Sequence, residues 1–222
     1  MSKTVKKHFD TIAAKYDYFK KKNWYYYKNL KSLYRQLIPK GKAVLEIGCG
    51  TGDLISGLDA GLAIGIDISP EMIKIARKKY PIGQFKVAAI EDFVTQDVFE
   101  YIFLADVIEH LENIPSTIKA IAKRCNNKTK VIFTYANPIW EPILMFLEKL
   151  SLKMPEGPHY RIPYFKLKKI LAKNGFVTIE RNWRLLIPAN IPFLSNFINV
   201  SFYRVPLLRR LGMLEYIIIK KK

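Results

Sequence analysis

Cysteine is scarce in this chain, and no uninterrupted apolar run is long enough to cross a membrane. The 222 residues include two cysteines, Cys49 and Cys125, with neither a metal-site spacing nor a disulfide framework. No apolar stretch follows Met1, so the sequence predicts no signal peptide and a cytoplasmic protein. An apolar segment over 185–208 is broken by prolines, asparagines and an arginine, which argues against a transmembrane helix.

Acidic side chains are also scarce outside the middle of the chain. Lysine and arginine total 37 against 19 acidic residues, a net charge of +18. Residues 1–42 carry a net +10, residues 43–148 carry −4, and residues 149–222 carry +12. These basic flanks leave two interpretations open, an anionic partner or a lysine-rich surface that is only solvated. A hydrophobic fraction of 50% predicts one domain with a full core.

What the chain does have is a glycine-dense turn directly after a predicted buried strand. The strand Val44–Ile47 runs into Gly48, Gly50 and Gly52, and a second strand ends in the carboxylate of Asp67. Glycines let the backbone approach a ligand closely, and an acid at the next strand end accepts hydrogen bonds from a ribose diol. The pattern therefore predicts a nucleoside site.

The residue after these glycines favours one class of nucleoside cofactor. Dinucleotide enzymes place a third glycine where this chain has Asp53. A carboxylate there would repel a pyrophosphate and suit a cofactor with positive charge. S-adenosylmethionine carries a sulfonium and an ammonium group, so we expect that cofactor.

Strands and helices alternate along most of the chain, which is typical of a doubly wound, mostly parallel α/β sheet. Ser69 and Pro70 predict a helix start, as N-cap and first helical residue. The first forty residues also read as helical. The expected strands are 43–47, 62–67, 84–88, 100–105, 130–135, 176–182 and 214–219. The expected core helices are 53–58, 70–79 and 115–125.

These segments resemble the class I S-adenosylmethionine-dependent methyltransferases, in the small-molecule, quinone-biosynthesis-like branch. The resemblance implies a Rossmann-like seven-stranded sheet, mostly parallel with one antiparallel strand and helices on both faces. It rests on segments in register over most of the chain: VLEIGCGTGDL (44–54), GIDISPEMI (65–73), AAIEDF (88–93), FLADVIEHLEN (103–113) and the passage 167–180.

The resemblance also implies a set of cofactor-binding residues. Asp67 would bind the ribose, Ile68 and Met72 would flank the adenine, and Glu46 would help to shape the methionine pocket. Ala89 stands where the family often has Asp, so Glu91, Asp92 or a backbone carbonyl would contact the adenine amino group. The alternative for Glu46 and Asp67 is a helix-capping role. The full set is Tyr16, Glu46, Gly48, Cys49, Gly50, Gly52, Asp67, Ile68, Met72, Ile90, Glu91, Asp92 and Ala105.

The candidate catalytic residues are Asp106, Glu109 and His110, just after the fourth expected strand. If a helical turn begins there, the three share one face. His110 is then a candidate base. The trio resembles the E-x-x-E-H of quinone-biosynthesis O-methyltransferases, but its first residue is Asp, and we predict no metal site. Base or acceptor positioning, metal binding and a structural role are the three alternatives. His159, beside Tyr160 and Arg161, is a further group within reach of the acceptor.

The remaining segments point toward the methyl acceptor. We expect a single methyltransferase domain over 1–222, in which residues 1–42 form a helical cap, 43–135 bind the cofactor, and 136–165 and 183–213 are substrate-side insertions. The aromatic segment 185–208 is consistent with peripheral membrane contact. It is equally consistent with a lid or a dimer face.

The combined prediction is methyl transfer to oxygen of a small or lipid-linked acceptor. An RNA methyltransferase is the first alternative, favoured by charge alone, and no RNA-binding module is recognisable. A non-catalytic S-adenosylmethionine-binding protein is the second. The sequence leaves the acceptor and the oligomeric state open.

Overall fold

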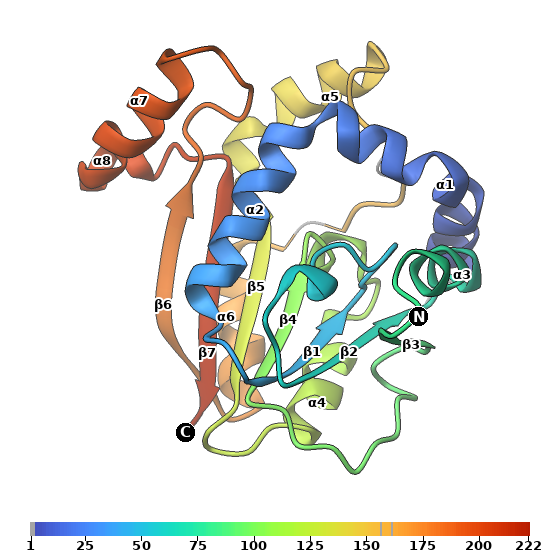
Figure 1. Ribbon diagram of the computed structural model, residues 1–222. Coiled ribbons are helices and arrows are strands. Elements are labelled where there is room, and N and C mark those ends of the chain that lie inside the picture. The colour runs from blue at the N-terminus through green and yellow to red at the C-terminus, as the bar shows by residue number, and fades with distance from the viewer. Residues whose placement is uncertain (1–2, 156, 161) are drawn as a thin grey trace.

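The computed structural model describes residues 3–155, 157–160 and 162–222, and its centre is a seven-stranded sheet (Figure 1). The strand order is β3-β2-β1-β4-β5-β7-β6. The strands are β1 (Ala43–Ile47), β2 (Leu62–Asp67), β3 (Gln84–Val87), β4 (Tyr101–Ala105), β5 (Lys130–Ala136), β6 (Phe176–Arg184) and β7 (Leu214–Lys221).

Strand β7 is the one antiparallel member of this sheet, because it runs opposite to both of its neighbours, β5 and β6. The pairings among β1, β2, β3, β4 and β5 are all parallel. The predicted fold class is therefore confirmed, and each expected strand lies within two residues of an observed one.

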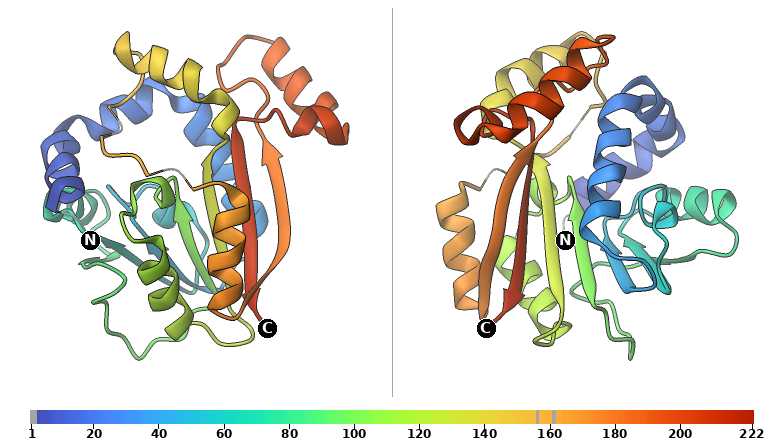
Figure 2. Two further views of the ribbon diagram at one scale, coloured as in Figure 1. Left: turned by 180° about the vertical axis from the view of Figure 1, so that it is seen from behind. Right: turned by 60° about the vertical axis from the view of Figure 1, so that its left-hand side comes forward.

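The helices cover both faces of the sheet (Figure 2). The α-helices are α1 (Lys3–Lys22), α2 (Trp24–Leu37), α3 (Pro70–Lys79), α4 (Ile114–Lys123), α5 (Glu141–Lys149), α6 (Tyr164–Lys173), α7 (Leu194–Ser201) and α8 (Pro206–Arg209). Short 3-10 turns are η1 (Ile55–Gly57), η2 (Ile108–His110), η3 (Pro138–Trp140) and η4 (Phe202–Arg204). Helix α3 begins as predicted, since the Ser69 hydroxyl accepts a hydrogen bond from the Met72 N–H at 3.1 Å.

The core divides into two layers because alternate strand residues point to opposite faces. Leu45 and Ile102 pack with Ile118 of α4 on one face, together with residues of α6. Val44 and Phe103 lie on the other face, with residues of α2 and α3. Because β1, β2 and β4 are parallel neighbours, their carboxyl ends meet at one edge of the sheet.

One sequence-based expectation needs correction, and the expected insertion over 183–213 gains its secondary structure. The helix expected over 53–58 is only the 3-10 turn η1, because the chain must return from the end of β1 to Leu62, which pairs with Ala43. A 3-10 turn rises about 2.0 Å per residue against 1.5 Å for an α-helix, and it covers that return in fewer residues. Between β6 and β7, where a hairpin would suffice, the chain forms α7, η4 and α8.

Candidate functional site

A cavity of about 1090 Å³ lies over the carboxyl ends of β1, β2 and β4. Between β1 and β4 the strand order reverses direction, and ligands of open α/β sheets bind at such a switch point. Helices α1 and α2 form one wall of the cavity, and α5 and residues 188–190 extend it upward. The volume exceeds the ~300–1,000 Å³ typical of a site for one small ligand.

The glycine turn forms the floor of this cavity. Gly48 has φ +75° and Gly50 has φ +53°, a backbone conformation that other residues adopt only with strain. A Cβ on Gly48 would meet Val107 at 2.4 Å, and one on Gly50 would meet the Tyr16 ring at 3.4 Å. Gly48 is therefore required both by its φ and by the close approach of Val107, whereas Gly50 is favoured by its φ alone.

Asp67 is held in place by the backbone on both sides. Its Oδ2 accepts a hydrogen bond from the Gly50 N–H, and its Oδ1 accepts one from the Ser69 N–H, both at 2.9 Å. The residue is 9% exposed, and burial raises the pKa of its carboxyl. Because each oxygen keeps a lone pair, Asp67 can still accept hydrogen bonds from a diol in the cavity.

Glu46 lies deeper in the same wall. Its Oε2 accepts a hydrogen bond from the Ile55 N–H at 3.1 Å, so the capping role and the cavity position coexist. Burial raises the pKa of Glu46 well above its usual range, while the charge of Lys20 acts in the opposite direction. Glu46 and Lys20 both line the cavity and together offer one acid and one ammonium.

Asp53 does not face the ligand as an unpaired acid. Lys20 Nζ lies 3.0 Å and Lys79 Nζ 2.6 Å from its two carboxylate oxygens. Burial alone would raise the pKa of Asp53, but these lysines and the Tyr80 hydroxyl hold it well below its usual range. The argument that Asp53 repels a pyrophosphate is therefore weakened, because two cations offset its charge.

Polar contacts hold helix α1 over the end of the cavity that contains the glycine turn. Ser69 Oγ donates to Asp10 at 2.6 Å, and Thr51 Oγ1 donates to Asp17 at 2.7 Å. Lys79 Nζ also reaches Asp17 at 2.7 Å. With the Lys20–Asp53 pair, these contacts hold Tyr16 against the glycine turn.

Most of the residues predicted to bind the cofactor line this one cavity. Those that do are Tyr16, Glu46, Gly48, Cys49, Gly50, Asp67, Ile68, Met72, Ile90 and Ala105. Gly52 instead packs under the turn, where a Cβ would meet the Phe85 ring at 2.7 Å. Glu91 accepts a hydrogen bond from Thr117 Oγ1 at 2.7 Å and lies beside the cavity, and Asp92 is exposed.

Asp106 is the most unusual group in the cavity wall. It has φ +55°, which is uncommon for a residue other than glycine. Tyr26 donates its hydroxyl to Asp106 Oδ2 at 2.7 Å. The other oxygen, Oδ1, is buried, and no group in the described part of the chain donates to it. Burial, and then the charge of Glu109, raises the pKa of Asp106 to about 7.

Glu109 and His110 also line the cavity, but they do not share a helical face with Asp106. That expectation was wrong because the turn η2 begins only at Ile108, after the left-handed residue Asp106. Glu109 Oε1 accepts a hydrogen bond from the Ala136 N–H at 3.1 Å. His110 Nδ1 lies 3.0 Å from the Pro158 carbonyl oxygen, and burial lowers its pKa.

The loop that follows α5 brings a second histidine to this cluster. The His159 ring lies 5.0 Å from the His110 ring, and its Nε2 is 3.9 Å from Glu109 Oε1. Arg161, next to it in the sequence, lies outside the described residues. Over residues 3–155, 157–160 and 162–222, no group of three or more His, Cys, Asp or Glu side chains is arranged to hold a metal ion.

Tyr26 and Lys20 were not identified from the sequence. Their partners, Asp106 and Asp53, lie 80 and 33 residues away, so no local spacing reveals these contacts. The run of three tyrosines at 25–27 is the signal that could have directed attention to this part of α2.

Comparison with known proteins identifies the family. A family model described as a methyltransferase domain matches residues 19–181. An uncharacterized protein of Methanocaldococcus jannaschii is 34% identical over 125 residues, 56% of this chain and 58% of that protein. A ubiquinone biosynthesis O-methyltransferase of Aromatoleum aromaticum is 28% identical over 154 residues, 63% of this chain and 66% of that enzyme. The chain thus matches less than two thirds of the length of these two relatives.

A solved structure agrees with the fold over the whole chain. A SAM-dependent methyltransferase of Thermotoga maritima, described as a possible histamine N-methyltransferase, superposes with a TM-score of 0.74 at 16% identity. The superposition covers 98% of this chain and all of that one (100%), and at this identity it bears on the fold alone. With the family model matching most of the chain, this protein belongs to the class I S-adenosylmethionine-dependent methyltransferases.

Proposed function

We propose that the protein transfers a methyl group from S-adenosylmethionine to an oxygen of a small or lipid-linked acceptor, with Asp106 as the general base. The observation that carries this proposal is the Asp106 carboxyl. One of its oxygens is held by Tyr26, and the other is buried in the cavity wall without a donor among the described residues. Asp106 lines the cavity, so once the carboxyl turns toward it, a hydroxyl group of the acceptor is a donor that would satisfy this oxygen.

The residues around the glycine turn fit the methyl donor. When bound, S-adenosylmethionine supplies a methyl group on a sulfonium, which is a good leaving group. Asp67 would accept from the ribose hydroxyls, and Ile68 and Met72 would flank the adenine. Glu46 and Lys20 would hold the ammonium and the carboxylate of the methionine part, since both line the cavity.

The environment of Asp106 suits proton abstraction. Catalysis by a general base is most effective when its pKa lies near the working pH, and this carboxyl has a pKa of about 7. When the acceptor oxygen forms its bond to the methyl carbon and the bond from that carbon to sulfur breaks, the proton on the acceptor oxygen would pass to Asp106 Oδ1. Tyr26 keeps Oδ2 fixed. In this proposal Asp106, and not His110, is the base. His110 instead positions the loop that carries Pro158.

The acceptor end of the cavity favours an amphiphilic molecule. Phe9 and Phe19 of α1, and Leu144 and Leu147 of α5, contribute apolar wall there. The relative from Aromatoleum aromaticum acts, by its name, in ubiquinone biosynthesis, which supports an acceptor with an apolar tail. We also propose that residues 185–208 contact a membrane.

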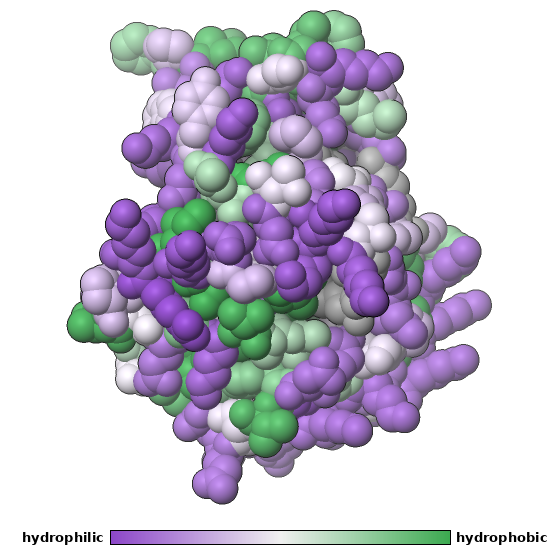
Figure 3. All heavy atoms as spheres, turned by 90° about the vertical axis from the view of Figure 1, so that its right-hand side faces the viewer, coloured by the Kyte–Doolittle hydropathy of each residue, from purple (hydrophilic) through white to green (hydrophobic). Residues whose placement is uncertain are grey.

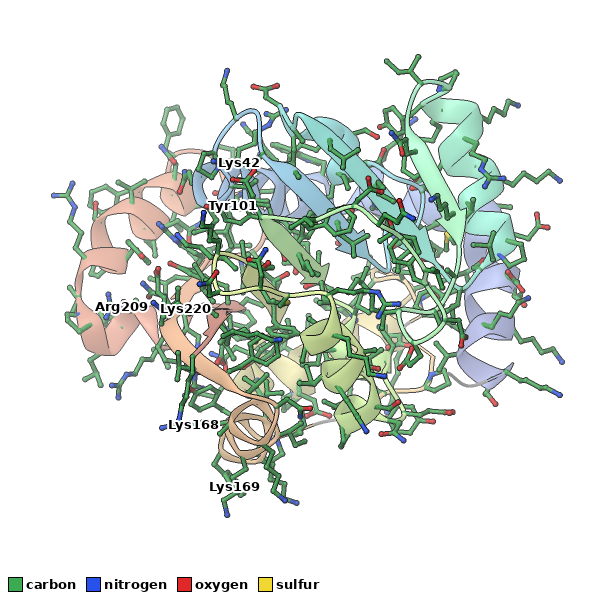
Figure 4. All side chains as sticks on the ribbon, turned by 90° about the horizontal axis from the view of Figure 1, so that it is seen from below. Lys42, Tyr101, Lys168, Lys169, Arg209 and Lys220 are labelled. Carbon is green, nitrogen blue, oxygen red and sulfur yellow. The ribbon has the colours of Figure 1, made fainter. Side chains whose placement is uncertain are left out.

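The charge distribution gives less support to an RNA acceptor. Figure 4 shows Lys168 and Lys169 projecting outward from α6, and Lys42 and Lys220 at the lower end of the molecule. The cavity lies at the opposite edge of the sheet, over the carboxyl ends of β1, β2 and β4. Much of the basic charge of the C-terminal flank therefore does not face the cavity.

The test uses radiolabelled S-adenosylmethionine and a panel of phenols, lipid-linked alcohols and transfer RNA. We expect transfer to a hydroxyl compound, with kcat/KM rising as Asp106 ionises and levelling off above a pH of about 7. Asp106→Asn should reduce kcat by roughly 10²–10⁴-fold, the usual contribution of a general base. Transfer to RNA alone would overturn the proposal.

Tyr26→Phe provides the matched variant. The Tyr26 hydroxyl stabilises the ionised carboxylate, so its loss raises the pKa of Asp106 and moves the kcat/KM profile to higher pH. A variant that only damaged packing would lower the rate at every pH without moving the profile. An unshifted profile would exclude Asp106 as the titrating base.

A further inference from the structure

The exposed apolar side chains of this protein are concentrated at one end. Of the 24 large apolar residues exposed in the described chain, 15 lie within residues 139–152 and 191–211. These two segments contain α5 and α7–η4–α8, which stand above the carboxyl ends of the parallel strands in Figures 1 and 2. Green, apolar residues also line the upper edge of the molecule in Figure 3. We call this end the apolar face.

Helix α7 turns Ser195 and Asn199 inward and leaves Leu194, Phe197 and Val200 exposed, unlike an ordinary surface helix, whose apolar side faces the core. Ser195 is 1% exposed, and its hydroxyl donates to the Ala189 carbonyl at 2.7 Å. Asn199 donates to the Ile187 carbonyl at 2.9 Å and accepts from the Ile187 N–H at 2.9 Å. Meanwhile Phe197 is 62% exposed. The inner polar bonds fix the helix so that its apolar side points outward.

Helix α5 is apolar on both of its sides. Leu144 and Leu147 line the cavity, while Ile143 and Phe146 are 50% and 61% exposed. None of its nine residues is buried. Between Glu141 at its start and Glu148 and Lys149 at its end, α5 is therefore an apolar helix that no core encloses, and a lipid surface is the other environment that suits such a helix.

The charge of the apolar face is mainly basic, although α5 contributes Glu141 and Glu148 beside Lys149. Residues 185–213 include three arginines and no acidic residue, and Arg204 and Arg210 are exposed. Lys20–Lys22 at the end of α1 line the adjoining part of the cavity. An anionic lipid surface is complementary to these arginines and lysines.

The cavity extends from the carboxyl ends of the strands to the apolar face. Its lining includes Leu144 and Leu147 of α5 and, across from them, Pro188, Ala189 and Asn190. No helix in the described ranges has the length and hydropathy needed to cross a bilayer, so any contact with lipid is at its interface.

We propose that α5 and residues 191–211 together dock on an anionic lipid bilayer, and that a lipid-linked acceptor enters the cavity between α5 and residues 188–190. The docking stands on the exposed residues and their charge. The entry route rests on the proposed function, because it requires an acceptor with a lipid tail.

Co-sedimentation with vesicles tests the docking. The probes are phosphatidylcholine vesicles with and without phosphatidylglycerol. We expect binding to the anionic vesicles that weakens with salt. The triple variant Phe146→Ser, Phe197→Ser, Leu207→Ser should bind at least roughly ten-fold more weakly. Arg204→Gln with Arg210→Gln should reduce binding to anionic vesicles in particular.

The matched control places the same change on exposed apolar residues elsewhere. Ile82, Val94 and Val98 are 100%, 87% and 62% exposed, and Ile82→Ser, Val94→Ser, Val98→Ser should bind vesicles like the parent. No binding by the parent, or equal loss in both triple variants, would overturn the docking. Dimerisation in lipid-free ultracentrifugation that only the first variant abolishes would assign the face to self-association instead.

Binding of S-adenosylhomocysteine by calorimetry separates the two proposals. All these surface variants should keep it, which also verifies their folding. Vesicle binding without methyl transfer to any hydroxyl acceptor would contradict the proposed function and leave the docking intact. Methyl transfer without vesicle binding would contradict the docking alone.

Discussion

At the scale of single residues, Asp106 combines features that lower stability. It is a carboxylate in a left-handed conformation, with one buried oxygen that has no donor in the described structure. Its pKa of about 7 compares with an ordinary value of 3.8. The folded protein therefore retains a proton that the unfolded chain releases, and stability falls as pH rises through that interval.

Asp106→Asn should stabilise the fold while impairing the reaction. Above a pH of about 7 the aspartate is ionised in the folded state, and the neutral amide removes that unfavourable charge. We expect the free energy of unfolding to rise by about 1–3 kcal/mol near pH 8. Near pH 4, where the carboxyl is largely neutral, the gain should almost vanish. Urea denaturation at both pH values measures this, and an equal effect at the two values would contradict the explanation.

At the scale of elements, helix α1 serves as a cover that is held by polar contacts. Its bonds to Ser69, Thr51, Lys79 and Asp53 are at the surface or partly buried, so each contributes little to global stability. They join a helix to the turn beneath it, and their loss should free the helix without unfolding the sheet.

Asp17→Ala should speed the release of the cofactor product. Asp17 binds both Thr51 and Lys79, so the change removes two of the contacts over the glycine turn. We expect the dissociation rate of S-adenosylhomocysteine, by stopped-flow fluorescence, to rise roughly 5- to 10-fold for a loss of about 1 kcal/mol or slightly more. Asp59→Ala, which breaks the exposed Lys40–Asp59 pair, is the control and should leave that rate unchanged.

The elements that the sequence predicts well are those with local signals. The strand ends at Ile47 and Asp67 and the cap at Ser69 follow from neighbouring residues, and they were located correctly. Contacts between distant parts were not predictable in the same way. The interpretation of Asp53 as an unpaired acid did not include its ion pair with Lys20. Glu91 was expected at the cofactor, although it accepts a hydrogen bond from Thr117, 26 residues later in the chain.

At the scale of the whole molecule, one cavity is lined by α1, α2, the strand ends, α5 and residues 188–190, so a ligand that fills it contacts all of them. A ligand at about 100 times its Kd adds roughly 2.7 kcal/mol of stability. For a chain of this size that corresponds to a rise in Tm of about 5–10 °C. Differential scanning calorimetry with S-adenosylhomocysteine should record this rise for the parent protein. Asp67→Ala should abolish it, whereas a rise that persists in Asp67→Ala would place the ligand elsewhere.

The position of β7 between β5 and β6 has a consequence for biosynthesis. Residues 131–135 of β5 are buried in the finished sheet, and their partner on that side, β7, is translated after the other six strands. Until residue 221 has left the ribosome, the nascent chain presents β5 as an open, apolar edge, the kind that recruits foreign strands. We therefore expect the unfinished chain to bind chaperones during translation, and chains that are released early to be degraded rapidly.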